Sequence, residues 1–180
     1  MTQYIGIIRG INVGGHNKVN MKELRDVMTK HKYQDVRTYI QSGNIVFRSG
    51  LTSVGAIEKS LSNLLKSTFE VNVPVLVRDE KEWKRTIKRN PFLERTEDFT
   101  KLLVTFLSEK PSPELVKATS LINFPHDVFT IDGKDIYLYC MDGYGKCDVP
   151  NNFFEKQLKV KGTTRNWKTV LELGEITAGS

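Results

Sequence analysis

Residues 36–48 read VRTYIQSGNIVFR, two runs rich in β-forming residues that are separated by Ser42 and Gly43. Two such runs joined by a Ser-Gly pair are typical of a β-hairpin with a two-residue turn. The first run is 36–41 and the second is 44–48. We therefore expect two antiparallel strands here, and this hairpin decides how the flanking segments are arranged.

The segments on either side of the hairpin alternate between strand and helix patterns. An apolar strand is expected over residues 4–9, and Asn20 with Glu23 has the spacing of a helix capping box. Apolar residues at helical spacing predict another helix around 57–65, and an apolar strand follows at 73–77. The order βαββαβ is that of a ferredoxin-like unit, in which two helices cover one face of a four-stranded antiparallel sheet. One further helix closes this half.

The second half repeats the β-α-β-β order without repeating the sequence. A strand is expected over residues 101–107, and the helix after it starts at Ser112-Pro113, an N-cap followed by proline. A hairpin over 128–140 follows. A helix led by proline comes next, and Thr163 or Thr164 is expected to cap a last helix.

The polar segment 90–100 is broken by proline and has no clear periodicity, so we place the boundary between the halves there. The sequence thus predicts an α+β protein with two ferredoxin-like subdomains. The first spans residues 1–95, and the second spans 96–180 with extra C-terminal helices.

The composition excludes several classes of protein. The chain has 180 residues, of which 39% are hydrophobic and 27% charged, as in ordinary globular proteins. No apolar run is long enough for a membrane helix, and residues 1–4 have no feature of a secretory signal, so we expect a cytoplasmic protein without membrane contact. Cys140 and Cys147 are too few for a disulfide scaffold and lack partners at zinc-ligand spacing. We expect no metal or cofactor.

The basic residues are concentrated in the first half. Residues 1–95 carry a formal charge of +8, and residues 96–180 carry −2. This asymmetry allows nucleic-acid binding through the first half, with the open sheet face used as in RNA-recognition domains. The strand at 44–48 contains only one aromatic residue, which gives bases little to stack on, and a plain solvated surface is the favoured explanation of the charge.

Three polar stretches are candidates for binding a ligand. The glycine-rich stretch 9–15 precedes a helix, where backbone N–H groups suit an anion, and the hairpin tip at 41–44 presents amide side chains. Near the C-terminus, Arg165 and Asn166 stand beside Trp167. The candidate binding residues are Arg9, Asn12, Gly14, Gly15, Lys18, Gln41, Ser42, Asn44, Arg165 and Asn166. Ordinary turn and cap chemistry is the alternative role for each of them.

An enzyme is the weaker alternative. The three histidines are dispersed, and no acid/base pair or metal cluster is visible. Cys147 lies beside Lys146, which favours a thiolate, but it has no evident base partner.

Four motifs together resemble a known family. They are RGINVGG at 9–15, TYIQSGN at 38–44, NPF at 90–92 and TRNW at 164–167. In this order and over nearly the whole chain, they are similar to the bacterial domain-of-unknown-function family DUF1697. The resemblance implies a two-subdomain α+β protein with ferredoxin-like halves, and it implies no activity, substrate or catalytic residue. The family pattern has serine where this chain has Cys147.

The leading hypothesis is a protein that binds a small anionic ligand, such as one bearing phosphate. Clefts between subdomains are usual places for such sites. We expect the three polar stretches to converge near the junction of the halves, which would place Asn12, Gln41 and Arg165 around one ligand. The sequence leaves the oligomeric state open.

Overall fold

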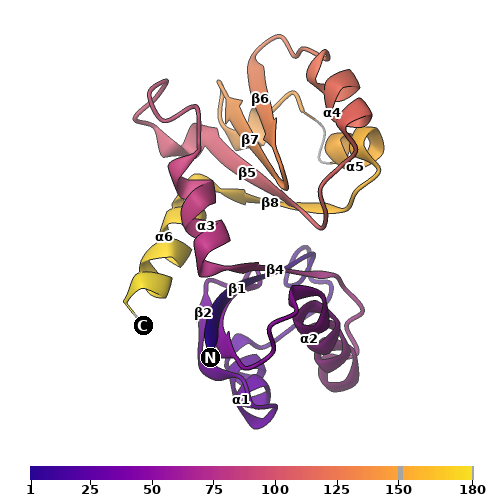
Figure 1. Cartoon of the computed structure of the whole chain (residues 1–180), viewed down its shortest axis with the longest axis vertical. Helices are drawn as coiled ribbons and strands as arrows, with labels where there is room; N and C mark the ends of the chain where they lie inside the picture. The colour runs from indigo at the N-terminus through magenta and orange to yellow at the C-terminus, as the bar shows by residue number, and fades with distance from the viewer. Residues whose placement is uncertain (150–151, 180) are drawn as a thin grey trace. The chain divides into compact units, whose positions relative to one another are not determined.

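The computed structural model describes residues 1–149 and 152–179 (Figure 1). Contacts divide the chain into two compact units, one of residues 1–85 with the end of the chain from 172, and one of residues 86–171. The divisions fall inside α3 (Glu80–Lys88) and α6 (Trp167–Ala178). The boundary at residue 95 expected from the sequence stays a prediction.

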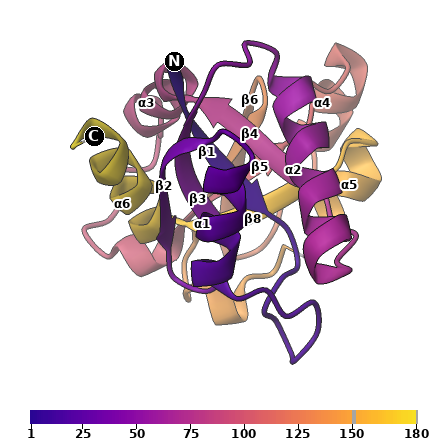
Figure 2. The same ribbon diagram turned by 90° about the horizontal axis from the view of Figure 1, so that it is seen from below.

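The first unit contains a four-stranded antiparallel sheet in the order β2-β3-β1-β4. Its strands are β1 (Thr2–Ile8), β2 (Gln34–Tyr39), β3 (Asn44–Ser49) and β4 (Val75–Asp79). Helices α1 (Met21–Lys30) and α2 (Val54–Phe69) lie together on one face of this sheet, as the view from below shows (Figure 2). This arrangement confirms the ferredoxin-like unit that the sequence predicts.

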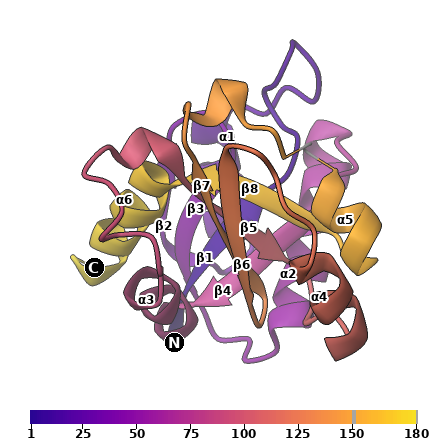
Figure 3. The ribbon, with the colours of Figure 1, turned by 90° about the horizontal axis from the view of Figure 1, so that it is seen from above.

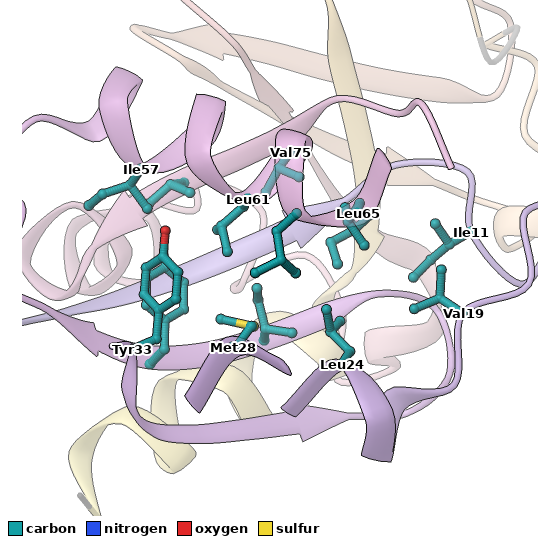
Figure 4. Close-up of a cluster of buried hydrophobic side chains, with 14 of the residues drawn as sticks. Ile11, Val19, Leu24, Met28, Tyr33, Ile57, Leu61, Leu65 and Val75 are labelled. Carbon is teal, nitrogen blue, oxygen red and sulfur yellow. The ribbon is translucent and has the colours of Figure 1, made fainter. Parts of the chain in front are cut away.

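The core of the first unit lies between the sheet and its two helices. Alternate residues of the central strands, such as Ile45 and Phe47 of β3, belong to one cluster with Met28 of α1 and Leu61 of α2. Figure 4 shows Met28 and Leu61 in this cluster. Each of these side chains is at most 1% exposed, and burying one such side chain stabilises a fold by roughly 1.5–3 kcal/mol. The hydroxyl of Tyr33 reaches the edge of this core and donates to Ser60 Oγ at 2.9 Å.

The connection between β2 and β3 is longer than the sequence suggests. It is a four-residue loop over 40–43 instead of a two-residue turn, with positive φ at Ile40 (49°) and Gly43 (84°). The Gly43 carbonyl accepts from Ile8 N at 2.7 Å, and the Asn44 side chain donates to Tyr39 O and Ser42 Oγ. The loop is therefore fixed by the end of β1 and by a buried amide.

Replacing Gly43 with alanine tests this packing. The new Cβ would lie 2.9 Å from atoms of Ile8 and Ile11, at a φ of +84°. We expect Gly43→Ala to lower the free energy of unfolding by about 2–4 kcal/mol, because overpacking adds to the backbone strain. Urea denaturation measures this loss.

Gly15→Ala is the matched control. Its φ is +80°, but its Cβ would meet no atom of the described residues within 4 Å. We expect a loss of about 1 kcal/mol from backbone strain alone. Equal losses for the two variants would show that Gly43 is not closely packed.

The second unit contains a sheet of the same topology, in the order β6-β7-β5-β8. Its strands are β5 (Leu102–Leu107), β6 (Asp127–Asp132), β7 (Asp135–Cys140) and β8 (Gly162–Asn166). Helices α4 (Pro113–Ser120) and α5 (Phe153–Leu158) pack on one face, side by side in Figures 1 and 3. Two short 3-10 helices, η1 (Phe99–Lys101) and η2 (Tyr144–Lys146), complete it.

Strand β8 corrects one expectation. Thr163 and Thr164 do not cap the last helix, because both pair with β5. The cap is Asn166, whose Oδ1 accepts from Thr169 N at 2.8 Å. With β8 in place, both units have the βαββαβ order, and the α+β class predicted from the sequence is confirmed. In the described part of the chain, no helix is both long and apolar enough to cross a membrane.

Candidate functional site

The second unit contains a hollow of about 750 Å³ that is lined by three separate segments. Its size lies within the usual range for small-molecule sites, roughly 300–1,000 Å³. The lining residues are Phe99, Thr100, Asp142, Gly143, Tyr144, Gly145, Lys146, Asn166 and Lys168. Asn166 is the one member of this set that the sequence analysis names as a candidate.

The loop of residues 141–148, which follows β7, supplies the largest part of the lining, and it is held at both ends. The buried carboxylate of Asp127 accepts from Met141 N at 3.1 Å through Oδ1 and from Asp148 N through Oδ2. A disulfide joins Cys140 to Cys147, whose Cα atoms are 5.3 Å apart. Neither sulfur is therefore the free thiol that the enzyme alternative requires of Cys147.

The short helix η1 presents Phe99 and Thr100. The Asp98 carboxylate accepts from the Thr100 hydroxyl at 2.6 Å and from Thr100 N at 3.1 Å. These two bonds, the hydroxyl bond first, lower the pKa of Asp98. The cap fixes the turn that leaves the Phe99 ring 40% exposed.

The start of α6 supplies the third segment. Asn166 caps the helix, and the free N–H groups of a first turn create a positive potential that favours anions. The Lys168 side chain is exposed there, and Lys146 is exposed on the loop. Among the described residues, neither ammonium group forms an ion pair.

The lining is both positively charged and aromatic. It contains two lysines, Lys146 and Lys168, and one carboxylate, Asp142, so its net side-chain charge is positive. Phe99 and Tyr144 add exposed aromatic rings, with Tyr144 54% exposed. Positive charge next to aromatic rings suits a ligand that is anionic at one end and flat at the other.

The sequence predicts a helix that begins after Thr163 or Thr164, which would place Arg165 in its first turn. The structure places Arg165 on β8 instead. Its Nη1 donates to Thr163 Oγ1 at 3.0 Å and to Thr164 O at 2.9 Å. Burial lowers the pKa of Arg165 to about 10, and Tyr144 acts electrostatically in the opposite direction. Arg165 stays charged at neutral pH and adds positive potential one residue from Asn166.

Polar groups of the glycine-rich stretch form several hydrogen bonds with other residues of the first unit. Asn12 donates to Val19 O at 2.9 Å and to Gln41 O at 2.8 Å, and its Oδ1 accepts from Val19 N at 2.9 Å. Asn17 donates to Gly10 O at 2.9 Å. Arg9 is half-buried just after β1, and Gly14, Gly15 and Lys18 are exposed.

The Asn12 to Gln41 bond shows that two of the three polar stretches meet in space. Asn44 is fully buried and, like Ser42, bonds within its own hairpin. Gln41 borders a smaller hollow of about 290 Å³, where Arg25 already donates to Thr38 Oγ1 at 2.6 Å. That these two stretches also meet Arg165 and Asn166 around a ligand stays a prediction.

The nucleic-acid alternative also stays a prediction. RNA-recognition domains stack bases on aromatic residues of the sheet face opposite the helices. In this sheet Ile5 and Ile7 of β1 and Val46 of β3 belong to that face, and none of these three is aromatic.

The charged and aromatic residues on which the character of the large hollow depends were not predicted as binding residues: Phe99, Tyr144, Lys146 and Lys168. They come from three separate segments of the chain and belong to no spaced motif. The available signal was the glycine-rich loop 142–148. Asp127 carried no signal, because its role depends on its pairing with Cys140 across two strands.

The first prediction for these sites concerns Asn12. We expect Asn12→Ala to lower the free energy of unfolding by about 2–4 kcal/mol, because several hydrogen bonds between the glycine loop and the hairpin are lost together. Asn17→Ala is the control, since Asn17 has a similar φ (49° against 55°) but its side chain makes one hydrogen bond among the described residues, to Gly10 O. It should lose about 1–2 kcal/mol in thermal or urea unfolding. Equal losses would contradict the anchoring role of Asn12.

The second concerns the pH dependence of Asp98. Because the folded pKa is lowered, this carboxylate stabilises the fold above its unfolded pKa, and the contribution is lost as the pH falls through the folded value. Thr100→Val should raise the pKa of Asp98 toward its ordinary value in an NMR titration. Thr96→Val removes a hydroxyl that accepts from Asp98 N and should leave that titration in place. An unchanged Asp98 titration in Thr100→Val would contradict the cap.

Comparison with known proteins agrees with this architecture. A family model described as a protein of unknown function (DUF1697) matches residues 1–137. The conserved bacterial protein SP0830 from Streptococcus pneumoniae has a similar structure, with a TM-score of 0.75 and 26% identity over 98% of each chain. No curated protein matches the chain.

Proposed function

We propose that this chain, which belongs to the DUF1697 family of proteins of unknown function, binds a small anionic ligand with a flat apolar group in the hollow of its second unit. A nucleoside monophosphate has this chemistry. The proposal depends on one observation. Lys146 and Lys168, which form no ion pair with any described residue, line the same concave surface as two exposed aromatic rings. The site lies wholly within residues 86–171, so the proposal does not depend on a junction between the halves.

The anionic end of the ligand is assigned to Lys146, Lys168 and the first turn of α6. A lysine ammonium group can donate a charge-assisted hydrogen bond to a phosphate oxygen, and such a bond is stronger than a neutral one. The N–H groups of the first turn add a dipole of the same sign. Asn166 caps this turn and so fixes where those groups point.

The flat end is assigned to the rings of Phe99 and Tyr144. Each ring leaves a large apolar area in water when the hollow is empty of ligand, and stacking covers that area. Thr100 and Asp142 provide a hydroxyl and a carboxylate at the rim for polar groups of the ligand. These residues would recognise and hold the ligand.

Calorimetric titration with adenosine monophosphate tests the proposal. Adenosine and inorganic phosphate are titrated separately, because each supplies only one end of the ligand. We expect the monophosphate to bind more tightly than either part, and Lys168→Ala and Tyr144→Ala each to weaken it roughly fivefold to tenfold, the loss of about one charge-assisted or stacking contact.

Lys22→Ala is the matched control, since Lys22 is an exposed lysine at the smaller hollow near Gln41. It should leave the affinity unchanged. If Lys22→Ala lowered the affinity for the monophosphate and Lys168→Ala did not, the ligand would bind in the first unit, and the proposal would be wrong. Equal affinities for phosphate and the monophosphate would remove the role of the rings.

A further inference from the structure

We infer that Cys140 and Cys147 form a reversible thiol–disulfide modification site that controls the order of the loop lining the hollow of the second unit. The inference rests on the proposed function for its consequence, which is a change in ligand affinity. Its physical core, the release of the loop on reduction, can be measured without a ligand.

The position of the disulfide in the chain gives the first argument. It closes a short ring of chain whose members include Asp142, Tyr144 and Lys146, all of which line the hollow. Cys140 is the last residue of β7 and is 0% exposed, so one end of the ring is anchored in the sheet. The other end, Cys147, lies just beyond η2. The bond therefore ties the ligand-facing segment directly to the core.

The remaining contacts of the loop give the second argument. Within the ring, Gly143 N donates to Cys140 O, Lys146 N to Gly143 O and Cys147 N to Tyr144 O. These bonds are local and fix turns, not the position of the loop on the sheet. Outside the ring, Asp127 holds Met141 and Asp148. Without the disulfide, the loop keeps the two hydrogen bonds to Asp127 but loses the covalent link that closes the ring.

The burial of the two cysteines indicates which sulfur is attacked first. Cys147 is partly buried and Cys140 is fully buried, so a thiolate of an external dithiol attacks Sγ of Cys147 and displaces the Cys140 sulfur. The second thiol of the reductant then displaces Cys147, which leaves two protein thiols and one reductant disulfide. Two electrons and two protons pass to the protein. A small-molecule disulfide reverses the reaction.

Asp127 lies beside both sulfur atoms. An oxygen of its buried carboxylate and the two sulfur atoms lie within 4.8 Å of one another. The same three groups are also possible donors to a divalent cation, so a chelator belongs in every sample.

Hydrogen exchange of the oxidised and the dithiothreitol-reduced chain tests the inference, with thiol titration alongside. We expect no titratable thiol before reduction and two after it. Amides of residues 142–147 should exchange roughly tenfold faster in the reduced chain, with the strands of the sheet and the amides of Met141 and Asp148 unchanged. Cys147→Ser should show the fast exchange with and without reductant, which controls for effects of the reductant elsewhere.

The affinity for adenosine monophosphate is then measured in both forms by calorimetry, and we expect reduction to weaken it at least fivefold. Equal exchange in the two forms, or two titratable thiols before reduction, overturns the inference whatever the ligand does. Faster exchange without monophosphate binding to either form supports the inference and rejects the proposed function. Faster exchange with equal affinity in both forms overturns control of the ligand site.

Discussion

One buried carboxylate, that of Asp127, positions the loop on which the candidate site depends. It stands at the start of β6, directly opposite Cys140 in the register of β6 and β7, and it accepts from a backbone N–H at each end of the loop. Hydrogen bonds to a charged group contribute about 1.5–3 kcal/mol each. Strands β6 and β7 thus fix the loop 141–148, whose only regular structure is η2. The positions of Tyr144 and Lys146 depend on this loop.

The two units use the same topology for different purposes. In the first, the polar side chains of the glycine loop and the hairpin, above all Asn12 and Asn44, hold the backbone in turns with positive φ. In the second, the equivalent tying is done by Asp127 and a disulfide, which leaves the side chains of the loop facing a concave surface. A residue with a high propensity for turns is therefore weak evidence for a binding role.

Local signals explain how much of the fold could be predicted. Asn20 and Ser112 accept from the first turns of their helices as expected, and Asp79 and Glu82 form a reciprocal cap. Strand β8 was not recognised, because Thr163 and Thr164 suit a helix N-cap as well as a strand, and only the pairing with β5 decides between the two. The site was largely missed because its residues come together only through the pairing of distant segments.

The most direct test of the account is a set of NOEs between adenosine monophosphate and the full chain in its oxidised form. The account predicts contacts from the base protons to the rings of Phe99 and Tyr144, with shifts of the amides at the start of α6. Contacts only to Ile40 and Met21, at the smaller hollow of the first unit, would contradict it.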